Sequence, residues 1–140
     1  AAFPLELAYR LVLMFSVRGD LVLDPFLGTG TTTIAAAAAG RCSAGREIDP
    51  VLCEAVPGLV MESVPEMNTL VLGRLERHRA FVREAEERGR ELRHVNARHG
   101  LKVVSSQETD LLLETVSAIR RTGPLTLEAE YEPAFPSGRP

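Results

Sequence analysis

The chain has 140 residues, of which 45% are hydrophobic and 25% charged, with a formal net charge of −3 at pH 7. This length and apolar content suit one globular domain with a single core. The longest run of small apolar residues, 34–39, is much shorter than the ~20 residues that cross a bilayer, so we expect a cytoplasmic protein. The acidic balance argues against a chain that grips nucleic acid alone. Cys42 and Cys53 lack zinc-site spacing, which predicts buried free thiols and no metal.

The first half of the chain predicts an α/β unit with a parallel sheet. Pro4 suits a first helical turn, and apolar residues follow it at helical spacing. Pro57-Gly58 should end the last helix of this half. In chain order we expect a helix over 4–15, a strand over 21–24, a helix over 31–39, a strand over 42–47 and a helix over 50–56. The strand–helix–strand part forms one right-handed βαβ unit.

The second half predicts long helices and late strands. Ser63 and Glu66 have the spacing of a capping box, and so do Ser105 and Glu108. The first box should start a helix that reaches His99, bent or split at its glycines. We further expect a strand over 101–105, a helix from 105 to 121 ended by Thr122-Gly123-Pro124, a short edge strand over 125–131 and a disordered tail over 132–140. The predicted domain is therefore 1–131, with a motif-bearing core at 1–57 and an extension at 58–131.

The most informative segment runs from Leu21 to Thr32, where a strand enters a glycine turn that opens a helix. Gly28 and Gly30 supply the positive φ and bare backbone that a tight turn beneath a ligand needs. A nucleotide-triphosphate loop would need a lysine after the second glycine, and this chain has a threonine there. The dinucleotide pattern fails at its third glycine, where Thr33 stands. A cofactor without a pyrophosphate fits better.

An acidic residue follows on the second strand, about 20 residues beyond the glycines, which is the spacing at which Rossmann-type folds bind ribose hydroxyls. Glu47 is the candidate. A carboxylate accepts two hydrogen bonds side by side, which matches vicinal hydroxyls, and charged acceptors strengthen those bonds. Ile48 would pack against a base. The two strand ends thus predict one binding site.

Three motifs at matching separations carry a family resemblance: F-P-L-E-L at 3–7, G-D-L-V-L-D-P-F-L-G-T-G-T-T at 19–32 and G-R-E-I-D at 45–49. Residues 1–57 resemble the bacterial N4-cytosine/N6-adenine DNA methyltransferases with the permuted, β-type motif order. The resemblance implies a partial Rossmann-like fold that binds S-adenosylmethionine, with a parallel βαβ core, added long helices and a short edge strand. The cofactor-binding residues that it implies are Phe3, Pro4, Asp24, Phe26, Gly28, Thr29, Gly30, Thr31, Glu47 and Ile48.

Within that set, the resemblance places Phe3 and Pro4 beside the methionine part of the cofactor, residues 24–31 around the methionine and sulfonium, and Glu47 on the ribose. The family's catalytic motif, [DNS]-P-P-[YFW], holds the target amino group and stacks on the flipped base. The chain contains no Pro-Pro dipeptide, so no catalytic residue is assigned and the chain alone is expected to be inactive. We expect a C-terminal portion of an enzyme on double-stranded DNA, as a fragment, a truncated gene product or one of two complementary polypeptides.

Alternatives to this function remain open at the level of sequence. One is a non-catalytic regulatory or assembly subunit that keeps the cofactor fold, and another is part of an RNA or small-molecule methyltransferase. In the family's strand order the first strand would lie beside the catalytic strand, so its edge should be unpaired here and should bind a second copy or a complementary chain. From Arg74 to His99, eight arginines face five glutamates, a balance of +3. A solvated, ion-paired helix face is favoured there over a DNA-facing flank.

Overall fold

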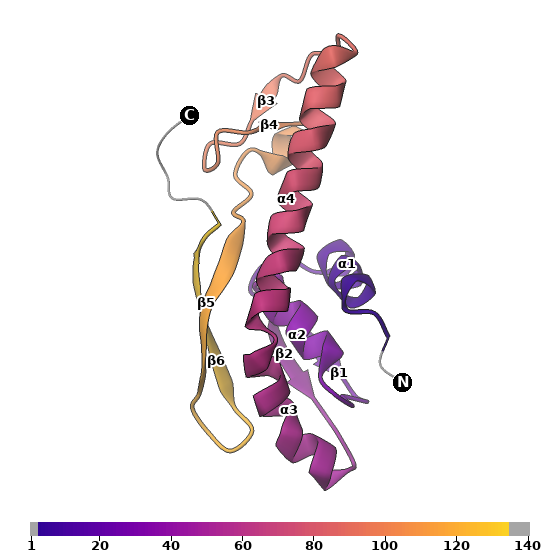
Figure 1. Cartoon of the computed structure of the whole chain (residues 1–140), viewed down its shortest axis with the longest axis vertical. Helices are drawn as coiled ribbons and strands as arrows, with labels where there is room; N and C mark the ends of the chain where they lie inside the picture. The colour runs from indigo at the N-terminus through magenta and orange to yellow at the C-terminus, as the bar shows by residue number, and fades with distance from the viewer. Residues whose placement is uncertain (1–2, 135–140) are drawn as a thin grey trace.

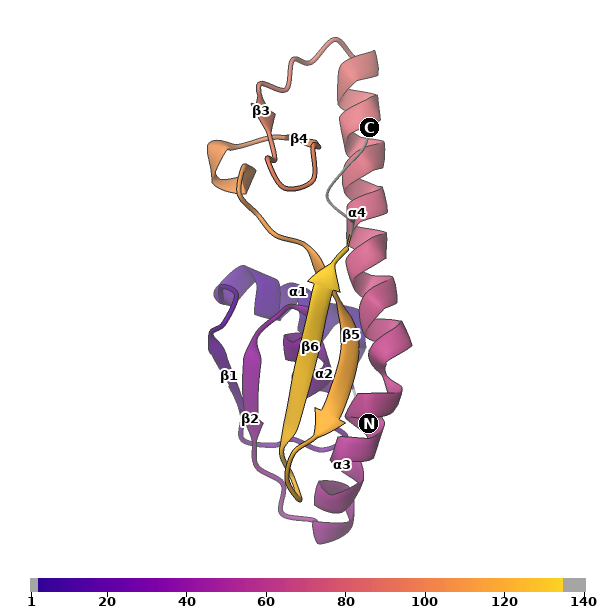
Figure 2. The same cartoon turned by 90° about the vertical axis from the view of Figure 1, so that its left-hand side faces the viewer.

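The computed structural model describes residues 3–134, which form an α/β structure built along one long helix (Figure 1, Figure 2). Helix α4 runs along the long axis of the molecule, with the β5–β6 hairpin on one side and β3 and β4 beside its C-terminal half (Figure 1). In chain order the elements are α1 (Leu5–Phe15), β1 (Leu21–Asp24), α2 (Thr31–Ala38), β2 (Cys42–Gly45), α3 (Pro50–Glu62), α4 (Val64–Glu87), β3 (His94–Val95), β4 (Lys102–Val103), the 3₁₀ turn η1 (Ser106–Glu108), β5 (Glu114–Arg121) and β6 (Leu127–Pro133).

The predicted βαβ unit is confirmed. β1 and β2 pair in parallel, with Leu21 opposite Cys42 and Asp24 opposite Gly45. Helix α2 contacts both strands, and its Ala35 and Ala36 are fully buried, so the alanine run does bring the helix close to the sheet. Strand β2 ends at Gly45, two residues earlier than predicted. The reason is local, because the carboxylate of Glu47 accepts hydrogen bonds from the next two backbone N–H groups and turns the chain there.

The prediction that Pro57-Gly58 ends a helix was wrong. Helix α3 continues to Glu62 with Pro57 inside it. An interior proline removes one backbone hydrogen bond and typically costs ~3 kcal/mol. Here Pro57 is buried next to Val56, and the extra turn buries Val60, which is 2% exposed. Apolar burial on this face therefore outweighs the local helix-breaking preference.

Helix α4 starts and ends differently from the prediction. The hydroxyl of Ser63 donates to Leu59 O (2.7 Å) at the end of α3, so the predicted capping box at Ser63 is absent. The helix ends at Glu87 and does not reach His99. Gly89 has φ +72°, and the N–H of Arg90 donates to Ala85 O (2.8 Å), which closes the helix C-terminus in the usual left-handed way.

The predicted helix over 105–121 was also wrong. The capping box of Ser105 and Glu108 is present, but it opens only the single turn η1. Residues 114–121 instead form β5, which pairs antiparallel with β6. The β-branched Thr115, Val116 and Ile119 suit a strand, and the pairing with β6 supplies the hydrogen bonds that a helix would have made locally.

The late strand expected over 125–131 is present as β6, and it extends through Pro133. The start of the predicted disordered tail, at 132 and 133, is thus part of a strand; positions 135–140 lie outside the described residues. The expectation of buried thiols was wrong as well. Both cysteines are free, but Cys42 is exposed and Cys53 half-buried. Among residues 3–134, no helix combines the length and apolar character needed to cross a membrane.

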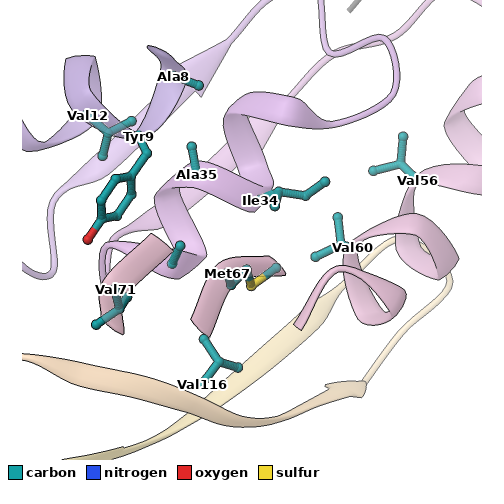
Figure 3. Close-up of a cluster of buried hydrophobic side chains, with 11 residues drawn as sticks. Ala8, Tyr9, Val12, Ile34, Ala35, Val56, Val60, Met67, Val71 and Val116 are labelled. Atoms are coloured by element: carbon teal, nitrogen blue, oxygen red, sulfur yellow. The ribbon is translucent and has the colours of Figure 1, made fainter. Parts of the chain in front are cut away.

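The core gathers side chains from α1, α2, α3, α4 and β5 (Figure 3). Met67 lies at its centre, 0% exposed. The hairpin is tied to the βαβ unit by Tyr131, whose hydroxyl donates to Ala37 O at 3.0 Å. The buried cluster consists of Ala8, Tyr9, Val12, Ile34, Ala35, Ala38, Val56, Val60, Met67, Val71 and Val116. One core therefore joins the motif-bearing first half to the late hairpin.

Asn68 holds the hairpin against α4. Its side-chain amide donates to Val116 O (2.9 Å), and its side-chain oxygen accepts from Val116 N (2.8 Å). The strand is irregular just after this point, between Val116 and Ala118. The asparagine thus replaces a neighbouring strand at the edge of β5 and satisfies both backbone groups of a residue that is 2% exposed.

Replacing Asn68 with alanine should lower the free energy of unfolding by about 1–3 kcal/mol, because both backbone groups of Val116 lose their partner in a buried position. The exposed neighbour Thr69 provides the control, since Thr69→Ala removes only a hydroxyl bond within the helix. Urea denaturation followed by circular dichroism measures both variants. Equal stability of the two variants would show that the hydrogen bonds between Asn68 and Val116 contribute nothing to stability.

Candidate functional site

The glycine turn after β1 has the backbone that the sequence predicts. Gly28 has φ +53° and Gly30 has φ +83°, both in the left-handed region that favours glycine. A Cβ atom on Gly30 would lie 3.0 Å from a methyl group of Val56, so the turn is also packed too closely for a larger residue. Asp24 accepts a hydrogen bond from Phe26 N (3.0 Å), which shapes the entry to the turn.

Glu47 joins this turn to the end of β2. Its carboxylate accepts from Gly28 N at 2.7 Å, from Ile48 N at 2.8 Å and from Asp49 N at 2.9 Å. Residues 19 positions apart are thereby fixed together at the carboxyl end of the parallel sheet, where open α/β sheets bind ligands. The backbone N–H of Asp49, followed by those of Gly28 and Ile48, lowers the pKa of this carboxyl, although desolvation acts in the opposite direction.

The Glu47 carboxylate keeps room for a ligand. A carboxylate offers about four acceptor positions, and backbone groups take three of them. A hydroxyl group can use the fourth, and a second hydroxyl can replace the bond from Gly28. The nearby side chains of Phe26 and Ile48 are 88% and 98% exposed, which leaves two apolar side chains uncovered close to this acceptor.

The start of α2 is the other polar feature of the site. Gly30 occupies the N-cap position, and no side chain caps the helix. The first backbone N–H groups of α2, from Thr31 onward, therefore lack a side-chain acceptor and suit an anionic group. Thr29 is exposed in the turn just before this helix. The site thus offers donors at the helix start and an acceptor at Glu47.

Phe3 and Pro4, two further residues of the predicted site, lie just before helix α1. Pro4 precedes α1, and its carbonyl accepts from Leu7 N (3.0 Å) and Ala8 N (3.3 Å). Phe3 is 45% exposed. Hydrogen bonds link Asp24 to Phe26 and Glu47 to Gly28 and Ile48, whereas Phe3 and Pro4 are assigned to the same site by the resemblance alone.

Sequence reasoning missed the role of Asp49. Its carboxylate accepts from Val51 N (2.8 Å) and caps α3, while its own N–H binds Glu47. The signal was present in the sequence, because Asp49-Pro50 is an N-cap followed by a first-turn proline. Two open cavities of about 620 Å³ also went unpredicted. One lies between β2 and the hairpin and includes Leu27 and Gly45 in its lining but not Glu47.

Comparisons with known proteins agree with the motifs. Residues 1–57 match the family model N6_N4_Mtase, described as DNA methylase. The type II methyltransferase M.MthZI of Methanothermobacter thermautotrophicus is 43% identical over 113 residues, covering 81% of this chain and 30% of that protein. M.MjaI of Methanocaldococcus jannaschii, also a type II methyltransferase, is 60% identical over 52 residues, covering 37% of this chain and 17% of that protein.

Among solved structures, a DNA modification methylase candidate of Thermus thermophilus, in complex with S-adenosyl-L-methionine, is 56% identical. That match covers 45% of this chain and 26% of the other, with a TM-score of 0.44. The chain spans less than a third of the length of the relatives that it matches. The match of residues 1–57 confirms the resemblance drawn from the three motifs, and this part of the chain is similar to the N6/N4 DNA methylases.

Proposed function

We propose that this chain is the S-adenosylmethionine-binding portion of a DNA amino-methyltransferase, with a partial Rossmann-like core. The observation that carries the proposal is the carboxylate of Glu47, held 2.7 Å from the backbone N–H of Gly28 at the carboxyl end of the parallel strands. The match of residues 1–57 to the N6/N4 DNA methylase family model supports the same assignment.

The residues present fit this cofactor. Glu47 has acceptor positions for ribose hydroxyls, and the uncapped start of α2 has N–H donors for a carboxylate. Ile48, at 98% exposure, is available to pack against an adenine ring. When bound, S-adenosylmethionine supplies an electrophilic methyl group on its sulfonium. The chain's own residues bind and orient: Glu47 fixes the ribose, and the glycine turn allows the backbone to approach closely.

Methyl transfer itself is assigned to a larger assembly. The chain contains no Pro-Pro dipeptide, and the relatives are more than three times as long as the matched part. We infer that a complementary polypeptide segment brings the catalytic motif and contacts the target base in double-stranded DNA. In this view the isolated chain binds the cofactor and transfers no methyl group.

The free edge of β1 is the proposed docking place for that segment. Cys42 N donates to Asp20 O and Arg46 N donates to Asp24 O, both at 2.9 Å, so alternation directs the backbone groups of Leu21 and Leu23 away from β2. The side chains of these two leucines are 66% and 68% exposed. Parallel sheets are normally covered on both faces, and this one is covered on one.

Helix α1 extends the same apolar character. Met14 is 72% exposed and Phe15 is 79% exposed, on the turn of chain that leads into β1. At ~25 cal/mol per Å² of apolar surface, covering residues of this size stabilises an assembly by several kcal/mol. A strand of the complementary segment would pair with the backbone groups at the edge of β1. An apolar helix attached to that strand would cover the exposed face of the sheet.

Titration calorimetry with S-adenosylmethionine tests the binding proposal. The chain should bind, and Glu47→Ala should weaken binding at least tenfold, because each hydrogen bond to a charged group contributes ~1.5–3 kcal/mol. Glu54→Ala, an exposed carboxyl on α3, is the matched control and should bind like the unmodified chain. Absence of binding by a chain that circular dichroism shows to be folded would contradict a preformed half-site.

The pH dependence of the Glu47 contact follows from its lowered pKa. A carboxyl whose pKa is depressed in the folded state keeps its contacts above the ordinary value of 4.5 and loses them only as the pH falls through the lower value. The amide signal of Gly28 in an NMR titration should therefore move below pH 4.5. In Glu47→Gln this transition should vanish. A Gly28 transition above the ordinary value would disprove the backbone-bonded carboxylate.

Light scattering at high concentration tests the edge of β1. In the absence of the complementary segment we expect two copies to pair through this edge, and the double variant Leu21→Lys, Leu23→Lys should be monomeric. Leu125→Lys, also an exposed leucine at 57%, should not alter the association. A monodisperse monomer of the unmodified chain would argue against the docking edge.

A further inference from the structure

Charge is unevenly distributed along the chain. Residues 74–102 contain nine cationic and five acidic side chains, a balance of +4, while the whole chain carries −3. The remaining residues therefore sum to −7. In the structure, 74–102 comprises the second half of α4 together with β3 and β4, which project beyond the core (Figure 1). Such asymmetry indicates a surface for a polyanion.

Several of these cations form ion pairs, and others do not. Arginines 79, 88, 93 and 98 and Lys102 each pair with a nearby carboxylate. Among residues 3–134, no ion pair is formed by Arg74, Arg77, Arg83 or Arg90. Arg74 lines a small cavity beneath β3 and β4 and is half-buried. The uncommitted exposed guanidinium groups of the projecting part are therefore those of Arg77, Arg83 and Arg90.

Two faces of α4 differ in what surrounds these arginines. Arg77, Phe81 and Arg88 follow one another at spacings of four and seven, so they share one face. The guanidinium of Arg90 lies 6.0 Å from the ring centre of Phe81 and joins them. We call these four residues the α4 stripe. The acidic residue of this face, Glu84, is paired with Arg88.

On a second face of α4, acidic residues balance the charge of the arginines. Arg83 lies about 120° around the helix from Arg77, at helical spacing from Glu76 and Glu87. Arg79, on the same side as Arg83, is paired with Glu76. Both faces carry arginines, but they differ in net charge. Substitutions of arginines on the balanced face therefore serve as the control for substitutions on the stripe.

We infer that the α4 stripe contacts the phosphate backbone of duplex DNA, an inference that rests on the proposed function. From Arg77 to Glu87, the last residue of α4, the helix advances about 15 Å, while duplex DNA carries one charge per ~1.7 Å of its axis, so the stripe spans several phosphates. Guanidinium groups match phosphate oxygens in two-point hydrogen bonds. The ring of Phe81 orients Arg90 before contact. These contacts position the protein on DNA and read no bases.

Fluorescence anisotropy with a labelled duplex of about 20 base pairs, from about 50 to 200 mM salt, tests the inference. Arg77→Gln with Arg90→Gln should weaken binding about tenfold or more at the lowest salt and reduce the slope of log K against log salt by about 1.8, or ~0.9 for each lost phosphate contact. Arg79→Gln with Arg83→Gln changes the net charge equally and should alter affinity less than about twofold at that salt. Equal effects of the two double variants, or no DNA binding by the unmodified chain at the lowest salt, would overturn the stripe.

The cofactor titration separates this inference from the proposed function. Both double variants should bind S-adenosylmethionine like the unmodified chain, whereas Glu47→Ala should weaken cofactor binding at least tenfold and keep the DNA affinity. If the stripe variants bind DNA like the unmodified chain while Glu47→Ala still weakens cofactor binding, the DNA contact assigned to the stripe is wrong and the cofactor site stands. If Glu47→Ala leaves cofactor binding intact, the assignment of the site is wrong whatever the DNA result.

Discussion

The hydrogen bond from Gly28 N to the Glu47 carboxylate is the constraint on which the functional interpretation depends. It closes the two loops that follow β1 and β2 onto each other at 2.7 Å, while the amides of Ile48 and Asp49 fix the second oxygen of the same carboxylate. An exposed acidic side chain would otherwise sample many rotamers, and a ligand would have to order it. Here the backbone has already oriented the acceptor before any ligand arrives.

The rest of the core packs on one side of the β1–β2 sheet from which these two loops emerge. Helices α1 and α2 contact each other closely, α4 packs on α2, and Asn68 with Tyr131 ties the late hairpin to the same core. The other side of the β1–β2 sheet is uncovered, and its edge residues Leu21 and Leu23 remain exposed. A sheet covered by helices on one side agrees with the proposal that binding and catalysis belong to different polypeptide segments.

The sequence predicted what depends on nearby residues. Gly28 and Gly30 need left-handed backbone, and the strands flank a helix of fitting length, so the βαβ unit and its glycine turn could be anticipated. The binding role of Glu47 stays a prediction. The errors arose where distant contacts decide. Strand β5 depends on β6 and on Asn68, 48 positions earlier, and α3 continues past Pro57 because the core buries Val60.

The placement of Phe3 and Pro4 at the site was expected from the family resemblance alone. No local pattern around these two residues predicts a contact with the glycine turn. The charge excess at 74–102 was visible in the sequence, but its division into a balanced and an unbalanced face required the ion pairs of α4. Helical spacing alone shows which arginines share a face; the structure shows which of them already have a carboxylate.

The most direct measurement is an NMR titration of the labelled chain with S-adenosylmethionine, following backbone amide signals. We expect the largest shifts on Gly28, the first turn of α2, Ile48 and Asp49. The Gly28 signal should move because the bond from its N–H to Glu47 is exchanged for one from a ribose hydroxyl. Shifts concentrated instead on the cavity between β2 and the hairpin, around Leu125 to Tyr131, with the Gly28 and Ile48 signals unmoved, would contradict it.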